Sequence, residues 1–323
     1  MRARRGATIS RRRVTLYGFG LAAAAVGVAA VARARSSRPP ATRLRTEQIA
    51  PDTEGYRGGS GTPLLLLHGI GVTWRSWKPV LPLLEAHHDV IAPTLLGHSG
   101  AARLADGLEP SLDALVDGVE AELDRLGLDK VHIAGNSLGG WTSLELARRG
   151  RARSVVVFSP AGEFSSNLRQ AALLASMRTR FRVAESHGAR LEKLASTLRG
   201  RKMLGRSQFE HPERADPLEL IADIRAIKNS LILRPLMKAL VSDPIRPLPD
   251  PGCPVRVVWP LRDRILPYKH HGKPIMEKLP SAELARLNGV GHVPMSDDPE
   301  AVSRLITEVT SSVDRLQITS EEH

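Results

Sequence analysis

The alternation of strand-like and helix-like segments is the feature of this 323-residue chain that most limits its fold. Short apolar runs typical of strands occur at residues 62–69, 89–94, 130–135, 153–160, 254–260 and 282–291. Segments with helical periodicity lie at residues 111–127, 138–150 and 299–316. Strands that alternate with helices favour a mostly parallel, twisted sheet flanked by helices on both faces. An α/β fold is therefore predicted.

The alternation is interrupted once, between residues 161 and 251, where no strand pattern occurs. Helical patterns occupy residues 165–184, 186–199, 216–228 and 230–241 instead. A long helical insertion between two strands predicts a lid over the carboxyl-terminal edge of the sheet, where open α/β sheets bind their ligands. The predicted division is a signal or anchor segment with linker at 1–45, a core at 46–160 and 252–323, and a helical lid at 161–251. The stretch up to about Gly61, rich in Arg, Pro, Ser and Gly, is predicted to be a linker.

The N-terminal segment has the pattern of a targeting sequence. Six arginines precede residues 14–32, which are 19 residues without a charge. As a helix they would span about 28 Å, close to the hydrocarbon thickness of a bilayer, roughly 30 Å. Residues 10–12, Ser-Arg-Arg, resemble a twin-arginine export signal, and the tripeptides at 30–32 and 32–34 fit a cleavage site. The chain is expected to be exported, or anchored in the cytoplasmic membrane through residues 14–32, and cleavage of the leader stays open.

The positive charge of the chain is concentrated in its first 50 residues, which bears on whether nucleic acid is a partner. The formal net charge is +12, but eleven arginines and one acid, Glu47, give the first 50 residues +10 and leave the rest of the chain with +2. The body is nearly neutral and contains no nucleic-acid-binding motif, so no nucleic-acid partner is expected. Within the body, residues 178–206 hold nine basic residues against Glu185 and Glu192. We interpret these basic residues as one face of a helix that is exposed to water. The alternative is that the lid binds an anionic lipid surface through them.

One serine stands between a strand pattern and a helix pattern. Gly135-Asn136-Ser137-Leu138-Gly139 is a G-x-S-x-G sequence. A nucleophile elbow turns so sharply that side chains two residues before and after the serine would collide with it, and the serine itself is strained with its hydroxyl exposed above the sheet. The N-terminus of the following helix favours developing negative charge at the same place. Ser137 is therefore the predicted nucleophile.

A serine nucleophile needs a base, and the base needs a carboxylate that orients it. Asp263 follows the strand pattern in VRVVWPLRDRILP, and His292 follows the last strand pattern in LNGVGHVPMSDDPE. The order Ser137, Asp263, His292 along the chain is similar to that of the serine α/β-hydrolases. The stretch around Asp263 resembles that family's W-G-x-x-D-x-x-x-P, with Pro260 in place of the glycine. The stretch around His292 resembles its G-H-x-x-x-x-x-x-P-E.

The resemblance to the α/β-hydrolase family extends to a fourth motif. His68-Gly69 in LLLLHGIGVTW is similar to the family's oxyanion-hole turn. The resemblance implies an α/β-hydrolase fold in which the backbone N–H groups of Ile70 and Leu138 hold the oxyanion. Four motifs in this order cover residues 62–310, and the resemblance is loose in the lid.

These motifs predict a serine hydrolase that cleaves a hydrophobic carboxylic ester through an acyl-enzyme, without cofactor or metal. A hydrolase of C–C bonds in ring-cleavage products is the alternative, because GNSLGG resembles the elbow of that group, although HGIGVTW lacks the Gly- and Pro-richer turn expected there. Perhydrolases and acyltransferases would use the same residues. A non-catalytic binding protein on this scaffold is disfavoured by the intact Ser137, Asp263 and His292. The serine excludes relatives with an aspartate nucleophile, namely haloalkane dehalogenases and epoxide hydrolases.

Other polar residues receive structural interpretations. His68 is expected to be structural and Asn136 to shape the elbow. Asp297 and Asp298 lie too close to His292 in sequence to be its partner and are interpreted as helix caps. Cys253, the single cysteine, is interpreted as a small structural residue. The pairs His87-His88 and His270-His271 are interpreted as surface residues, and Gly97-His98-Ser99-Gly100 has the wrong spacing for an elbow.

Overall fold

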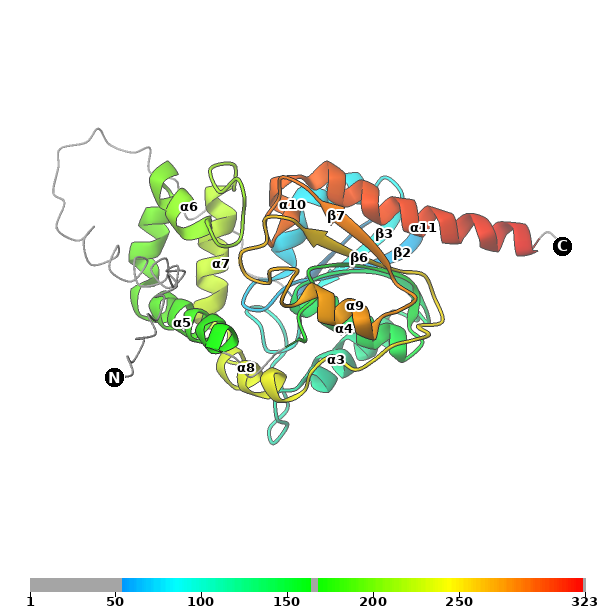
Figure 1. Ribbon diagram of the computed structural model, residues 1–323, viewed down its shortest axis with the longest axis horizontal. Coiled ribbons are helices and arrows are strands. Elements are labelled where there is room, and N and C mark those ends of the chain that lie inside the picture. The colour runs from blue at the N-terminus through cyan, green and yellow to red at the C-terminus, as the bar shows by residue number, and fades with distance from the viewer. Residues whose placement is uncertain (1–53, 164–167, 322–323) are drawn as a thin grey trace, which may run out of the picture. The chain divides into compact units, whose positions relative to one another are not determined.

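A computed structural model describes residues 54–163 and 168–321 of the chain. Seven strands form one sheet in the order β1-β3-β2-β4-β5-β6-β7 (Figure 1). The strands are β1 Gly55–Gly59, β2 Thr62–Leu67, β3 His88–Pro93, β4 Val131–Asn136, β5 Ala152–Phe158, β6 Val255–Pro260 and β7 Glu283–Leu287. Strand β1 is antiparallel to β3, and every other neighbouring pair is parallel. The predicted α/β fold with a mostly parallel sheet is confirmed.

Helices cover both faces of this sheet (Figure 1). They are η2 Trp74–Val80, α2 Leu81–Leu84, α3 Leu112–Arg125, α4 Leu138–Arg148, α9 Gly272–Lys278, α10 Pro294–Asp297 and α11 Pro299–Glu321. Consecutive residues of a strand point to opposite faces, and the leucines of β2 divide accordingly. Leu65 and Leu67 join the apolar core beneath α3 and α4, whereas Leu64 and Leu66 join the core beneath η2, α2 and α11. The apolar run of β2 therefore fills both cores at once.

Strand β1 corrects the prediction of a linker up to Gly61. Its sequence, Gly-Tyr-Arg-Gly-Gly, has no apolar alternation, and pairing with β3 at the edge of the sheet makes it a strand. Tyr56 anchors it by donating to Glu85 Oε1 at 2.6 Å and by stacking on Trp74. Gly59 has a φ of 82°, and a Cβ there would lie 2.3 Å from the carbonyl oxygen of His88. Glycine is therefore required where β1 turns towards β2.

Four helices of the described chain lie between β5 and β6, in the region predicted as a lid. They are α5 Leu168–Ala195, α6 Leu198–Gly205, α7 Pro217–Asn229 and α8 Leu233–Ser242. The two helices predicted at 165–184 and 186–199 form the single element α5, which kinks at His187, where φ is −130° and ψ is 19°. Helix α6 was not predicted, because five of its eight residues are basic or glycine and no apolar stripe results.

An ion pair network joins this helical region to the core. Arg75, which is buried at the start of η2, donates to both carboxylate oxygens of Glu219 on α7, each at 2.8 Å. Lys78 adds a bond of 2.6 Å to the same carboxylate. A bidentate arginine–carboxylate pair that is largely shielded from water has a defined geometry. Helix α7 is therefore held beside the turn that follows β2.

The predicted signal or anchor at residues 14–32 and its cleavage sites lie outside the described residues. Within residues 54–163 and 168–321, no helix has both the length and the apolarity needed to cross a membrane.

Candidate active site

Gly135 and Gly139 lie where strand β4 turns into helix α4. A Cβ on Gly135 would lie 2.3 Å from Ser143 Oγ and 2.4 Å from the carbonyl oxygen of Gly139. A Cβ on Gly139 would lie 2.1 Å from the carbonyl oxygen of Leu67. Real Cβ atoms do not approach other atoms this closely, so both positions require glycine. The clashes are with the neighbouring helix turn and with the end of β2.

Ser137 has the backbone geometry expected of a strained elbow. Its φ is 57° and its ψ is −115°, and Ser159 is the one other non-glycine residue with positive φ in the described chain. Such a conformation is costly for a residue with a Cβ and is typically found at functional sites. The hydroxyl of Ser137 makes no capping bond to α4, although the residue occupies the N-cap position. Ser111, by contrast, caps α3 through a bond of 3.0 Å to the N–H of Ala114.

Asp263 and His292 are in direct contact although they lie on separate loops. His292 Nδ1 and Asp263 Oδ2 are 2.8 Å apart, and both side chains are buried. An ionised carboxylate can only accept, so Nδ1 carries the proton and Nε2 is left as the basic nitrogen. The other oxygen of Asp263 accepts the N–H groups of Ile265 and Leu266, each at 2.8 Å. These two bonds fix the direction in which the carboxylate faces the imidazole.

The surroundings keep Asp263 ionised. Burial alone would raise the pKa of this carboxyl group, but the facing imidazole of His292 and the N–H of Leu266 lower it by more. The net result is a pKa below the ordinary value for aspartate. An ionised Asp263 can stabilise a positive charge on His292 when the imidazole takes a proton.

Asn136 joins the elbow to the histidine loop. Its Nδ2 donates to the carbonyl oxygen of Phe158 at 3.1 Å and to that of His292 at 3.0 Å. The backbone of His292 is therefore tied to the residue next to Ser137. This agrees with the structural role expected for Asn136.

His68 fixes the peptide group that carries the predicted oxyanion donor. The N–H of Leu95 donates to His68 Nε2 at 2.8 Å, so Nδ1 bears the proton and donates to the carbonyl oxygen of Gly69 at 2.7 Å. Because a trans peptide holds its C=O and N–H in opposite directions, this bond turns the N–H of Ile70 away from His68. Burial, reinforced by His98, lowers the pKa of His68 to about 3, so the ring stays neutral. His68 is therefore structural, as expected.

The two predicted oxyanion donors approach the serine from different elements. Gly69 lies against the elbow, since a Cβ placed on it would be 3.4 Å from the Cβ of Ser137. Leu138 is the first residue of α4. The N–H groups in the first turn of a helix have no partner within the helix, and its dipole adds partial positive charge there. The turn after β2 and the start of α4 therefore both adjoin Ser137.

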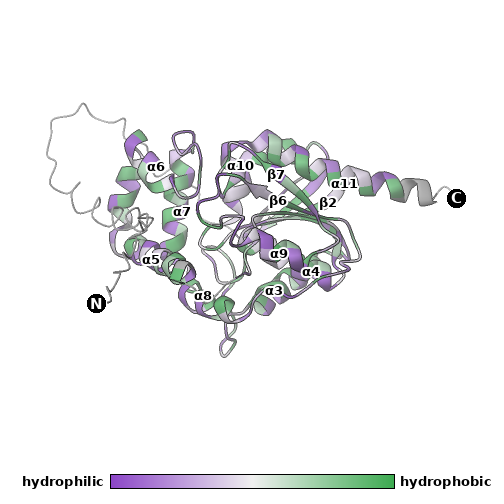
Figure 2. Cartoon of the chain, in the orientation of Figure 1, coloured by the Kyte–Doolittle hydropathy of each residue, from purple (hydrophilic) through white to green (hydrophobic). Residues whose placement is uncertain are grey.

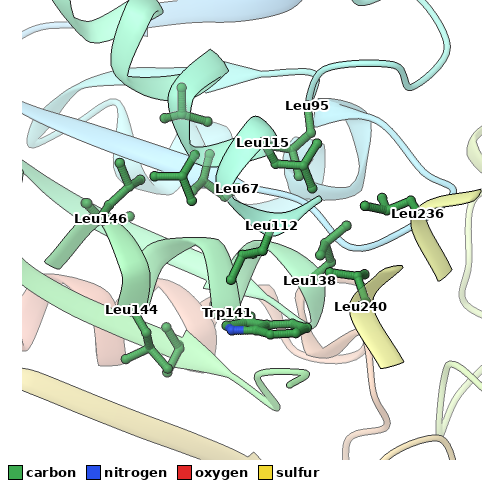
Figure 3. Close-up of a cluster of buried hydrophobic side chains, with 14 of the residues drawn as sticks. Leu67, Leu95, Leu112, Leu115, Leu138, Trp141, Leu144, Leu146, Leu236 and Leu240 are labelled. Atoms are coloured by element: carbon green, nitrogen blue, oxygen red, sulfur yellow. The ribbon is translucent and has the colours of Figure 1, made fainter. Parts of the chain in front are cut away.

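Apolar side chains of the lid helices surround this region. A Cβ on Gly71, just beyond the oxyanion turn, would lie 3.3 Å from Ile227 of α7, 3.4 Å from Phe181 of α5 and 3.6 Å from Leu233 of α8. Figure 3 shows Leu236 and Leu240 of α8 beside Leu138 and Trp141 of α4, within the same buried cluster. The surroundings of the elbow are therefore apolar on the lid side.

Asp297 corrects the interpretation as a helix cap. Its carboxylate is buried and accepts three backbone N–H groups, those of Gly291 at 2.7 Å, Glu210 at 2.8 Å and His211 at 2.9 Å. It thus ties the loop of His292 to a lid segment more than 80 residues away in sequence. Asp298 is a cap, as predicted, because its Oδ1 accepts the N–H of Ala301 at 2.9 Å.

Arg264 was not singled out in the sequence, and it holds the same lid segment from the other loop. Its Nη1 donates to the carbonyl oxygens of Arg206 at 3.0 Å and Phe209 at 3.1 Å, and its Nη2 pairs with the carboxylate of Glu210. The N–H of Val293 adds a bond of 3.0 Å to the carbonyl oxygen of Gln208. Residues 206–211 therefore contact both the loop of Asp263 and the loop of His292.

Two other interpretations from sequence need correction. His88 and His271 are buried, while their neighbours His87 and His270 are exposed, so neither pair is a surface pair. His88 lies between the carbonyl oxygen of Thr62 and Thr310 of α11, and His271 lies against the carbonyl oxygen of Glu163 in the segment that follows β5.

Cys253 is half-buried and is the single cysteine of the chain. Burial raises the pKa of Cys253 to about 11, which agrees with a structural role. In the portion of the chain that the structure describes, no group of three His, Cys, Asp or Glu side chains could hold a metal ion.

Comparison with known proteins places the chain in a family. Residues 64–305 match the alpha/beta hydrolase family, and the chain belongs to it. It is 35% identical over 199 residues to the epoxide hydrolase EphH of Mycobacterium tuberculosis, covering 60% of this chain and 92% of that protein. It is 37% identical over 116 residues to 2-hydroxy-6-oxo-2,4-heptadienoate hydrolase of Pseudomonas putida, covering 34% of this chain and 42% of that protein.

A solved structure shares the fold. A thermophilic esterase from Thermogutta terrifontis superposes with a TM-score of 0.64 at 21% identity, covering 80% of this chain and 93% of the esterase. At this identity the likeness concerns the fold. The relatives therefore support a hydrolase, and the bond that it cleaves must be argued from the site.

Proposed function

We propose that this protein is a serine hydrolase that cleaves carboxylic esters with an apolar acyl group. The observation that carries the proposal is the contact between His292 Nδ1 and Asp263 Oδ2 at 2.8 Å, made by loops tied to the strained elbow of Ser137. This arrangement leaves Nε2 of His292 as a base and the hydroxyl of Ser137 free of a capping role. A nucleophile, a base and an orienting carboxylate are the three groups that acyl transfer requires.

In the first half of the reaction, Ser137 Oγ attacks the ester carbonyl carbon while His292 Nε2 takes the hydroxyl proton. Ionised Asp263 stabilises the imidazolium that results. The N–H groups of Ile70 and Leu138 stabilise the tetrahedral oxyanion, each by about 3 kcal/mol. The C–O bond then breaks, the alcohol leaves with the proton from His292, and the acyl group stays on Ser137.

In the second half, water replaces the alcohol. His292 takes a proton from the water, which attacks the acyl-enzyme carbonyl. The carboxylic acid leaves and Ser137 regains its proton. No cofactor or metal takes part in either half.

The apolar lid side chains favour a hydrophobic substrate. Phe181, Ile227 and Leu233 meet just beyond the oxyanion turn, where groups attached to a bound carbonyl would lie. Apolar side chains stabilise an apolar acyl chain by about 0.8 kcal/mol for each buried methylene. We therefore infer that rates rise from the acetyl ester to longer acyl chains.

Epoxide opening fits this site poorly, although a relative carries that name. Attack by the Ser137 alkoxide on an epoxide carbon would form an ether, and water cannot hydrolyse an ether through an oxyanion hole. A carboxylate nucleophile would form an ester that water can cleave. The elbow holds a serine at this position, so we infer that epoxides are not turned over.

Hydrolysis of C–C bonds in ring-cleavage products is the second candidate. The relative from Pseudomonas putida named for a dienoate substrate supports it. This reaction would use the same Ser137, Asp263 and His292, and so would perhydrolase or acyltransferase chemistry. A further alternative is a non-catalytic binding protein with the same fold. The contact between Asp263 and His292 disfavours it.

Hydrolysis of a p-nitrophenyl ester series from acetate to palmitate tests the proposal. We expect the full-length chain to turn over these esters, and Ser137→Ala to lose roughly 10⁴-fold or more in kcat. A 2-hydroxy-6-oxo-dienoate and an aryl epoxide are assayed in parallel. Efficient cleavage of the dienoate without ester turnover would replace the ester proposal with the C–C hydrolase, and serine-independent epoxide opening would contradict both.

A further inference from the structure

The solvent-exposed side of helix α6 combines cations with large apolar side chains. Its exposed residues are Leu198, Arg199, Lys202, Met203 and Arg206. Leu198 is 52% and Met203 37% exposed, which is unusual for large apolar side chains. An α-helix turns about 100° per residue, so these five positions fall within one arc of about 140°. Arg206 belongs to this arc because its backbone remains helical, with φ of −52° and ψ of −32°.

The opposite side of α6 packs against other residues of the lid. A Cβ on Gly200 would lie 1.8 Å from the carbonyl oxygen of Leu194 in α5. A Cβ on Gly205 would lie 2.8 Å from Phe209 and from Pro212. The close packing of α6 on α5 therefore fixes which side of α6 faces solvent. The exposed arc of cations and apolar side chains on α6 therefore depends on the folded structure of the lid.

The two acids within residues 178–206 are already paired, and among the described residues the exposed cations of this stretch form no ion pair, although Lys202 is attracted to Glu213. Glu185 pairs with Arg234, and Glu192 with Arg225 at 2.9 Å. The exposed cations are the seven residues Arg178, Arg182, Arg190, Lys193, Arg199, Lys202 and Arg206. The stretch at residues 178–206 thus carries a net charge of +7, whereas the rest of the chain after residue 50 is negative.

We propose that the exposed arc of α6, made of Leu198, Met203 and the three cations Arg199, Lys202 and Arg206, is a lid face that binds an anionic lipid surface, and that the four exposed cations of α5 add to its positive charge. Figure 2 shows hydrophilic and apolar positions interleaved along α5 and α6. Lysine and arginine are attracted to anionic headgroups, and apolar side chains beside them enter the boundary between headgroups and acyl chains. Nucleic acid would satisfy the charge but leave Leu198 and Met203 in water, and for this reason a lipid surface is the better match.

Binding there would bring a lipid surface close to the candidate active site. Helix α6 continues directly into residues 206–211, which contact the loops of Asp263 and His292. The inference goes beyond the proposed hydrolysis and does not depend on it. Its test accordingly measures the environment of the lid face and no activity.

The test places an environment-sensitive NBD fluorophore on the lid face of the full-length chain. Met203→Cys is labelled in a Cys253→Ser background. Leu108→Cys in the same background is the matched control, because Leu108 is also exposed and lies in a loop of the core. Each protein is mixed with vesicles of phosphatidylcholine alone, or of equal parts phosphatidylcholine and phosphatidylglycerol. Bilayer-embedded doxyl lipids serve as quenchers.

We expect a blue shift and doxyl quenching at position 203 with the anionic vesicles, and neither change with neutral vesicles or at position 108. The comparison separates the lid face from the N-terminal segment, since insertion of residues 14–32 would carry both fluorophores to the vesicle but bury neither. Vesicle-bound protein whose fluorophore at position 203 stays in water would overturn the proposal. A response to single-stranded RNA, with none to anionic vesicles, would also overturn it.

A charge series supplies the second measurement. Arg199→Gln, Lys202→Gln and Arg206→Gln are combined in the protein labelled at position 203. Each cation contributes about fivefold to binding, so the lipid concentration for half-maximal shift should rise about 100-fold. The control combines Arg103→Gln, Lys269→Gln and Lys273→Gln, three exposed cations outside the lid face. An equal loss in the control would show that net charge, and not this face, governs binding, and would overturn the proposal.

Discussion

The carboxylate of Asp297 accepts the N–H of Gly291, the residue directly before His292, at 2.7 Å. The same oxygen accepts the N–H of Glu210 from the lid at 2.8 Å. One buried carboxylate oxygen thus holds the histidine loop and a lid segment together. The side chain of Asp297 bonds to Gly291, Glu210 and His211, so we infer that it acts on the site by positioning the loop of His292.

Asp297→Asn should lower kcat for p-nitrophenyl butyrate by about tenfold to 100-fold. Asparagine keeps one acceptor oxygen and gains an NH₂ that cannot accept, so at least one of the three N–H bonds is lost. A bond to a charged group contributes about 1.5–3 kcal/mol, and misplacement of a catalytic group by an ångström costs about 100-fold. The measurement is kcat and KM under conditions where urea titration shows the variant to be folded.

Asp298→Asn is the matched control for this prediction. It replaces a neighbouring carboxylate that caps α11 through Ala301. Because asparagine caps a helix about as well as aspartate, the change should cost less than about 0.5 kcal/mol of stability and leave kcat unchanged. If Asp297→Asn lost stability but kept full kcat, Asp297 would be a structural residue only.

The elbow glycine Gly139 should tolerate no side chain. A Cβ would lie 2.1 Å from the carbonyl oxygen of Leu67 and 2.7 Å from that of His68, and backbone atoms of this kind cannot move aside easily. We expect Gly139→Ala to lower the free energy of unfolding by more than about 4 kcal/mol, at the upper end of single-residue effects. Gly127→Ala, at a φ of 69° with open space around it, should cost about 1 kcal/mol. Urea unfolding of the two variants compares them, and equal losses would contradict the packing argument.

Stability should fall as the pH drops below about 6.5. Burial lowers the pKa of His68 to about 3 and that of His98 to about 4 from the ordinary value of 6.5. Below pH 6.5 these histidines bind protons in the unfolded chain but not in the folded chain. The free energy of unfolding is therefore highest above pH 6.5, and it decreases as the pH falls towards the folded-state pKa values of about 4 and 3. At pH 5 each ring should cost about 2 kcal/mol. Burial lowers the pKa of His88, His132 and His271 as well, which adds to the loss in the same direction.

Urea titrations at pH 7.5 and 5.0 measure this difference. His98→Gln should reduce the difference by about 2 kcal/mol, whereas the exposed His87→Gln should leave it unchanged. An unfolding midpoint that is the same at both pH values would show that the buried histidines titrate normally.

The parts of the site that could be predicted from the sequence are those set by local pattern. The glycines at 135 and 139 between a strand and a helix indicated the elbow, and the stretches around Asp263 and His292 follow strands whose apolar runs are plain. Asp263 follows β6 and His292 follows β7, which are neighbouring parallel strands, so their carboxyl ends lie close together. The pairing of Asp263 with His292 was predicted from the resemblance of both stretches to the α/β-hydrolase motifs.

The parts that could not be predicted depend on tertiary contacts. The role of Asp297 requires Glu210 and His211 of the lid, and their distance along the chain leaves no local signal. Strand β1 has three glycines in five residues and exists because β3 offers it an unpaired edge. His88 is buried against Thr310 of α11 and His271 against Glu163, whereas the adjacent His87 and His270 stay exposed. Local sequence is nearly the same in each pair, so it could not separate them.

The proposed mechanism requires Ser137 to be an activated nucleophile, and covalent labelling tests this requirement directly. The full-length chain is incubated with a fluorophosphonate, and the site of phosphonylation is located by peptide mass spectrometry. The account predicts stoichiometric modification at Ser137, none in Ser137→Ala, and labelling slowed by several orders of magnitude in His292→Ala. A folded protein that remains unlabelled, or one labelled equally fast without His292, would contradict it.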